Sequence, residues 1–311
     1  MRARAAMSGG GLSAPGRLPF RDLVLAMICP LAMAAGFVAA KTVLDVLPPI
    51  LLSALRHTIA GAALIWFVRP PFGSMWRLFG ITFVAATVQF CMTYAAMSYL
   101  DVATSALLVQ TEVPFAIIIA AVVTRSMPSH MQIGGTVLGM VGTLLVFGTP
   151  SVQDNYAAAV VMVLGSLVWA IGQNMVATLT RVGPLQLATW MAVFATLQLW
   201  PISLVVDGNP LPYLARLDLR DVGALAIVGI GPSIIGYGLW CRLIAKHGIV
   251  KFAPFLLTIP VITVGLGVWL LGDKLTPLMA IGGAVTLVGV ALTLDRKSAR
   301  RERCPDPSPA A

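Results

Sequence analysis

Two similar apolar stretches, IGGTVLGMVG (residues 133–142) and IGGAVTLVG (281–289), lie in opposite halves of the chain and decide its architecture. Each carries two glycines seven residues apart: Gly135 with Gly142, and Gly282 with Gly289. A proline precedes each stretch, Pro114 in the first half and Pro260 in the second. Small residues allow the close helix packing that membrane proteins need. We therefore expect an internal repeat of packed membrane helices, with helix breaks at the two prolines.

The composition excludes an ordinary soluble domain. Of the 311 residues, 58% are hydrophobic and 11% are charged, and the mean hydropathy is +0.90. Soluble domains carry about 25% charged residues. The net charge of +9 would suggest a nucleic-acid partner in a soluble protein. Here the basic residues lie between apolar runs, so membrane topology explains them better and no nucleic-acid partner is expected.

Ten apolar runs are long enough to cross a bilayer as helices, which takes about 20 residues. They are roughly 23–44, 49–68, 77–99, 102–124, 131–148, 157–180, 184–206, 221–245, 249–271 and 276–294. The runs lack the alternation of a membrane β-barrel. The prediction is an all-α integral membrane protein with ten transmembrane helices.

The repeat divides these helices into two units of five, over residues 23–149 and 156–295. A five-helix unit crosses the membrane an odd number of times, so the second unit enters from the opposite side and the repeats are inverted. Residues 1–22 form a cytoplasmic N-terminal segment, and residues 296–311 form a basic, Pro-rich cytoplasmic tail. Most of the 21 Lys and Arg residues then fall on the cytoplasmic side. Four fall on the other: Lys41, Arg216, Arg220 and Lys274.

Ionisable residues inside a membrane span are costly and are candidates for function. Glu112 lies in QTEVP of the fourth run, and Arg56 lies in the second. At 1.5 Å per residue they are about 15 Å and about 12 Å from the outer ends of their helices, so they could pair or face one cavity. The alternative for Glu112 is a carboxyl that only joins helices.

Other polar and aromatic residues within spans are candidates to line a path for a solute: Gln89, Gln110, Trp169, Gln173, Asn174, Tyr237 and Trp240. Their alternative role is helix packing or the interfacial aromatic belt. Lys41, Asp45 and Asp273 lie near outer helix ends and are candidates for an outer gate. Lys41 and Asp45 are four residues apart, a spacing that allows them to pair on one helix face. The four cysteines form no CxxC motif or Cys/His cluster, so no metal site is expected. Nucleotide-binding and hydrolase motifs are missing from the sequence, which predicts neither an enzyme nor a cofactor.

Three stretches resemble the EamA family of the drug/metabolite transporter superfamily. They are FVAAKTVLDVLPPILLSALRHTIAGAALIWFVRP (37–70), VWAIGQN (168–174) and IIGYGLWCRLIAKHGIVKFAPFLLTIPVITVGLGVWLLGDKLT (234–276). The first includes the family's lysine and its helix 2 arginine, here Lys41 and Arg56. The spacing is similar to that of bacterial exporters of cysteine and O-acetylserine within the family. This resemblance implies an inner-membrane exporter.

Four features depart from the family pattern. MAAGF (33–37) replaces a Trp-Gly-x-Asn motif, and the usual glutamate near the end of helix 9 is Asp273. Its first-repeat counterpart is missing from TRSMPS (124–129), and Glu112 stands where the similar exporters are neutral. These departures bear on the cargo rather than on the fold.

We therefore expect a multi-pass secondary transporter of the inner membrane that exports amino acids or related metabolites by alternating access. The alternatives are an importer or exchanger of another small metabolite, or a membrane subunit that transports nothing. The expected partners are a small-molecule substrate and the lipid bilayer, with the proton as a candidate coupling ion. Either a monomer or a homodimer fits.

The predicted topology can be tested with reporter fusions. A reporter fused after Arg77 should be cytoplasmic, and one fused after Asp154 should be exterior, because three predicted spans separate the two positions. Two reporters on the same side would contradict the ten-helix topology.

Overall fold

The computed structural model describes residues 20–180, 182–236, 238–239, 242–243 and 255–293. Within these residues every regular element is a helix. Eight helices are long and apolar enough to cross a membrane, and two shorter apolar helices cover Thr258–Leu271 and Pro277–Thr293. The predicted all-α architecture with ten membrane helices is confirmed, although the candidates Tyr237 and Trp240 lie outside the described residues.

The first repeat contains five spans, three of which consist of more than one helical element. Their elements are α1 (Phe20–Leu44), α2 (Pro49–Leu64) continued by η1 (Ile65–Phe67), α3 (Met75–Thr82) with the π-helical η2 (Phe83–Val88) and α4 (Gln89–Met97), α5 (Val102–Val109) with α6 (Glu112–Thr124), and α7 (His130–Phe147).

The second repeat follows the same order. Its elements are α9 (Tyr156–Val176), α10 (Pro184–Val206), α12 (Leu219–Ile230) with the π-helical η3 (Gly231–Gly236), α15 (Thr258–Leu266) with the π-helical η4 (Gly267–Leu271), and α16 (Pro277–Thr293). The short helices α8 (Pro150–Gln153) and α11 (Leu211–Leu214) lie in connections.

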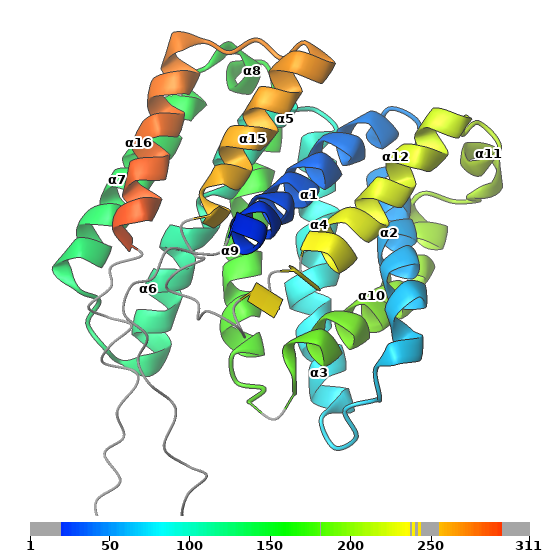
Figure 1. The fold of residues 1–311 in the computed structure, drawn as a ribbon. Coiled ribbons are helices and arrows are strands. Elements are labelled where there is room, and N and C mark those ends of the chain that lie inside the picture. Colours follow the sequence, from blue (N-terminus) through cyan, green and yellow to red (C-terminus); the bar gives the residue numbers. More distant parts are fainter. Residues whose placement is uncertain (1–19, 181, 237, 240–241, 244–254, 294–311) are drawn as a thin grey trace, which may run out of the picture.

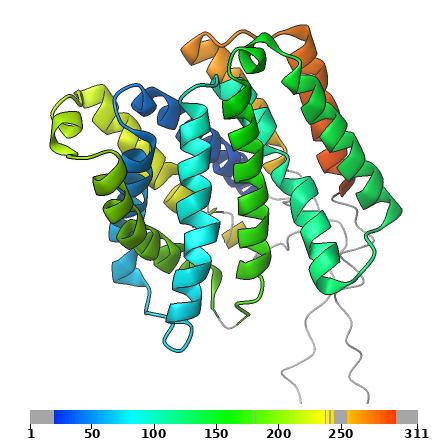
Figure 2. The same cartoon turned by 180° about the vertical axis from the view of Figure 1, so that it is seen from behind.

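The packing of the spans follows an approximate two-fold relation between the repeats. The second spans of the two repeats, α2 and α10, pack against each other, and so do the fifth spans, α7 and α16 (Figures 1 and 2). The third and fourth spans of each repeat pack instead on the first span of the other repeat. In the first repeat, α4 and α6 pack on α9, and in the second, α12 and α15 pack on α1. This exchange is what two inverted five-helix repeats produce.

The glycine pairs explain the closest of these contacts, between α7 and α16. A Cβ on Gly135 would lie 2.5 Å from the Gly289 carbonyl oxygen, and one on Gly289 would collide with the Gly139 backbone nitrogen. A Cβ on Gly282 would lie 2.9 Å from the Gly142 carbonyl oxygen. Only residues without a side chain permit this backbone approach.

The largest buried cluster closes the end of the bundle that is drawn at the top of Figure 1. We refer to this end as the upper end. It gathers apolar residues from eight spans, among them Val43, Leu52, Met97, Leu107, Val146, Ala159, Val228 and Met279. The connections 68–74, 125–129 and 177–180 mark the opposite, lower end. There the main cluster is smaller and joins α3, η2, the end of α9 and α10.

The two parts of the fourth span show the same contrast. Every residue of α5 from Val102 to Leu108 is buried, whereas Pro114 is the one buried residue of α6. The fourth span is therefore buried by protein above its interruption, whereas most of its residues below the interruption are only partly buried.

The α7–α16 contact predicts a strong effect of side-chain size at one glycine. Gly142→Val should lower the thermal unfolding midpoint of the detergent-purified protein, because its Cβ would collide with the Thr286 backbone. Overpacking of this kind costs about 1–3 kcal/mol. The matched control is Gly134→Val on the same helix, where a Cβ would meet nothing within 4 Å. Equal melting of the two variants would contradict the packing described.

Candidate functional site

Arg56 is held in the middle of α2 by two aromatic residues of α4. Its Nη1 donates a hydrogen bond of 2.8 Å to the Tyr94 hydroxyl, and its Cζ lies 4.1 Å from the centroid of the Phe90 ring. Such a cation–π contact stabilises a guanidinium while leaving its edge available for hydrogen bonds. Within the described residues Arg56 forms no ion pair, and the predicted direct pair with Glu112 is not formed.

His57 takes part in the same aromatic group. Its ring packs edge-on against Phe90 at 5.0 Å, and its Nδ1 lies 2.8 Å from the Ser53 carbonyl oxygen. Since His57 is buried, its packing and this bond account for it structurally. Phe90 is thus fixed between two residues of α2.

Glu112 begins α6 directly after the interruption of the fourth span. Pro114 has no N–H, so the Gln110 carbonyl loses its usual partner and instead accepts a 3.3 Å bond from the Val113 nitrogen. The Val109 carbonyl in turn accepts a 3.4 Å contact from the Ser166 hydroxyl of α9. Glu112 is a partly buried residue, and its carboxylate forms no hydrogen bond or ion pair with any described residue.

The second repeat has the same interruption without the charge. There a turn at Leu257 precedes α15, and Thr258 stands two residues before Pro260, as Glu112 stands before Pro114. The Thr258 hydroxyl donates 2.6 Å to the Phe255 carbonyl, and Thr111 makes the same three-residue contact to Leu108 in the first repeat. The site is therefore asymmetric, because only the first of the two equivalent positions carries a carboxylate.

The remaining path candidates lie on α4, on α9 and in the interruption itself. Gln89 is buried and donates 3.0 Å to the Thr93 hydroxyl, and its Oε1 has no partner among the described residues. Asn174 joins α9 to α6 through a 3.4 Å contact to the Ala116 carbonyl. Three further candidates are partly buried: Gln110 in the interruption, and Trp169 and Gln173 on α9.

The outer-gate candidates make contacts other than the Lys41–Asp45 pair. Lys41 donates 2.8 Å and 3.3 Å to the carbonyl oxygens of Met97 and Ser98 at the end of α4. Asp273 accepts a 2.9 Å bond from the Ala103 nitrogen at the start of α5. Burial raises the pKa of the Asp273 carboxyl, and its backbone hydrogen bonds and Lys41 oppose that shift. Asp45 is exposed and lines an open groove with Tyr99 and Tyr213.

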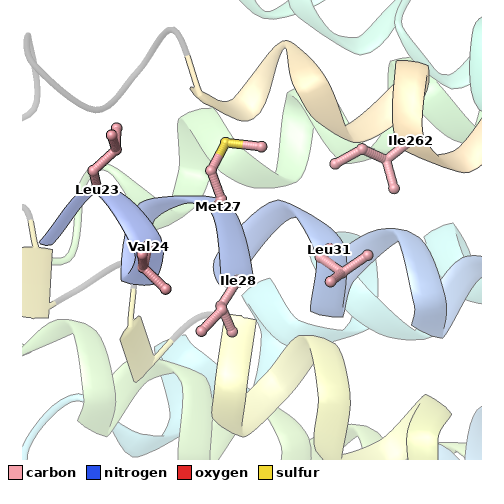
Figure 3. A pocket seen from close by; sticks show the side chains of 6 residues that line it. All are labelled: Leu23, Val24, Met27, Ile28, Leu31 and Ile262. Atoms are coloured by element: carbon pink, nitrogen blue, oxygen red, sulfur yellow. The ribbon is translucent and has the colours of Figure 1, made fainter. Parts of the chain in front are cut away.

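A second groove, of about 370 Å³, runs along the lower half of α1 beside Ile262 of α15 (Figure 3). All its lining residues are apolar: Leu23, Val24, Met27, Ile28, Leu31 and Ile262. It offers no polar group to a solute, and its apolar lining suits contact with lipid.

Sequence reasoning missed the aromatic partners of Arg56 and a residue that caps its helix. The Asp207 carboxylate accepts 3.0 Å from the Leu51 nitrogen at the start of α2 and 2.8 Å from the Ser203 hydroxyl. The i, i+4 spacing of Phe90 and Tyr94 was the available signal, because it places both rings on one helix face. Nothing local in the sequence ties Asp207 to α2.

Comparison with known proteins gives consistent matches. A family model described as "EamA-like transporter family" matches residues 21–148 and 157–295. The "Probable amino-acid metabolite efflux pump" of Escherichia coli (strain K12) is 24% identical over 288 residues, which cover 88% of this chain and 95% of that protein. The "Probable terminal-alkyne amino-acid exporter" of Streptantibioticus cattleyicolor is 25% identical over 208 residues, covering 66% and 68%.

A solved crystal structure shares the fold. It superposes with a TM-score of 0.59 at 18% sequence identity, over 91% of this chain and 99% of the other.

Proposed function

This chain belongs to the EamA-like transporter family, and from that premise we propose that it exports amino acids or related zwitterionic metabolites across the inner membrane by alternating access. Membership makes it a multi-pass membrane transporter of a small molecule. The names of its relatives favour amino-acid cargo.

The observation that carries the proposal is Arg56, a cation in the middle of a span with no acidic partner among the described residues. Phe90 and Tyr94 fix its guanidinium and occupy one of its five N–H donors. The remaining donors suit a solute carboxylate, which arginine binds through two parallel hydrogen bonds.

Glu112 supplies the complementary charge in the proposed site. Its carboxylate stands at the interruption of the fourth span and is free of protein partners among the described residues. A zwitterionic amino acid carries an ammonium for Glu112 and a carboxylate for Arg56. Glu112 could serve as a proton carrier instead, and the experiments below separate the two roles.

The direction of export is proposed from charge and burial together. The lower end carries basic connections, and by the positive-inside rule we propose that this end, with both termini, faces the cytoplasm. The described conformation has its large apolar cluster at the upper end, while most residues of α6, below the interruption, are only partly buried. This contrast supports a state that loads solute from the cytoplasm.

We predict that Glu112→Gln lowers counterflow of labelled zwitterionic amino acids in proteoliposomes by about tenfold or more. The substitution keeps the shape and removes the charge, and a hydrogen bond to a charged group contributes about 1.5–3 kcal/mol. Asp154→Asn, at an exposed position, is the control. Unchanged rate, substrate range and pH dependence would make Glu112 a structural residue. If only the pH dependence disappears, the proton role survives and the ammonium contact does not.

We predict that Arg56→Lys raises the KM for a zwitterionic solute about tenfold or more. Lysine keeps the charge but loses the planar fork that binds a carboxylate at two points. The exposed Arg216→Lys serves as its control. For an amino-acid amide, which lacks the carboxylate, Arg56→Lys should leave the KM unchanged. A KM equal to that of the unmodified protein would remove Arg56 from the proposed site.

A further inference from the structure

Two contacts from distant spans converge on the short turn 98–101 at the upper end. This turn joins α4 to α5 and so connects the third and fourth spans. Lys41 of α1 binds the carbonyls on one side of the turn, at Met97 and Ser98. Asp273, which follows η4, binds the Ala103 nitrogen on the other side.

Both contacts match the polarity of the helix ends that they meet. The last carbonyls of a helix carry partial negative charge and favour a cation, and the first N–H groups favour an anion. Lys41 and Asp273 supply these charges to α4 and α5. Asp101 caps α5 locally, since its Oδ1 accepts 2.6 Å from the Thr104 nitrogen. Asp45, Asp101 and Asp273 all attract Lys41 electrostatically.

The backbone before Asp273 is shaped for this contact. Gly272 adopts a left-handed φ of 74°, which turns the chain back at the end of η4. The Asp273 nitrogen then bonds the Gly267 carbonyl at 3.2 Å. A Cβ on Gly267 would lie 2.6 Å from the Asp273 Oδ2, so glycine is needed there to leave room for the carboxylate.

The first repeat has the same turn without the acid. Arg125 takes the left-handed conformation at the end of α6, with φ of 51°, and Ser126 follows it as Asp273 follows Gly272. The Ser126 hydroxyl contacts the Thr124 hydroxyl at 2.6 Å, within its own turn. The contact made by Asp273 at the upper end therefore has no acidic counterpart at the lower end of the fourth span.

A one-residue difference between the repeats accompanies this asymmetry. Pro114 precedes Arg125 by 11 residues (125 − 114), and Pro260 precedes Gly272 by 12 (272 − 260). The extra residue falls in η4, where π-helical turns replace the regular helix of α6. A π-helical turn accommodates one more residue than an α-helical turn, and such turns often mark functional sites.

We propose that Lys41 and Asp273 form a latch that holds the 98–101 turn and keeps the upper end closed, so that the resting transporter is open to the cytoplasm. The proposal rests on the alternating access and orientation proposed above. Opening the upper end would have to separate α1 and η4 from this turn and break both contacts. The lower end of the fourth span has no such acidic contact to break.

Cysteine accessibility tests the latch without requiring transport. Ala159→Cys places a thiol in the buried upper cluster, away from the latch, after the four native cysteines are replaced. A membrane-impermeant maleimide added from outside should label it slowly in the parent protein. Asp273→Ala and Lys41→Met should each speed labelling about tenfold or more, since tenfold corresponds to about 1.4 kcal/mol.

Two controls make the result specific. Asp154→Ala removes an exposed acid from the connection after α8, also at the upper end, and should label like the parent protein. Ala195→Cys, buried within α10, should stay unlabelled in every latch variant unless the whole protein loosens. Unchanged labelling in Asp273→Ala, an equal effect of Asp154→Ala, or labelling of Ala195→Cys would each overturn the latch. If Asp273→Ala speeds the labelling of Ala159→Cys only when the maleimide is added from the cytoplasmic side, the latch is supported and the proposed orientation is contradicted.

Discussion

A proline in the middle of a membrane helix removes a hydrogen bond where no water can replace it. In the fourth span this constraint acts on Gln110, whose carbonyl takes a substitute donor from the Val113 nitrogen. The Val109 carbonyl thereby loses Val113 and lies 3.4 Å from the Ser166 hydroxyl of α9, which is also 3.2 Å from the Met162 carbonyl. The helix therefore stops and restarts at a fixed place, and Glu112 is the first residue of the new segment. The break also divides the span into a buried upper part and a lower part whose residues are mostly only partly buried.

The inverted repeat supplies the framework for this arrangement, and its departures from symmetry are where charge appears. Close glycine contacts hold α7 to α16, and the remaining spans pack in exchanged pairs. Within that framework Glu112 faces no equivalent acid, because its counterpart is Thr258. Asp273 likewise corresponds to Ser126 of the first repeat, although Asp273 lies one residue further from the proline of its span. Two nearly equivalent halves thus differ at the groups on which we base recognition and closure.

Much of this fold could be predicted from the sequence, because hydropathy and small-residue spacing act locally. The ten spans and the role of Gly135, Gly142, Gly282 and Gly289 in close packing follow from such patterns. Partners between spans could not be predicted in this way. Lys41 was matched with Asp45 by spacing, yet it binds carbonyls 56 and 57 residues away. Arg56 was matched with Glu112 by depth, yet it contacts an aromatic pair on α4. The interruption at residues 110–111 was predictable only approximately, since a proline acts on the preceding turn.

The central claim is that this transporter recognises a solute through both of its charges. Equilibrium binding of a labelled zwitterionic amino acid to the purified protein tests it most directly, with unlabelled analogues as competitors. The account predicts saturable binding that the zwitterion displaces, whereas the corresponding amide and the corresponding deaminated acid each compete at least about tenfold more weakly, because each loses one charged contact. Equal competition by all three compounds, or no saturable binding of any of them, would contradict it.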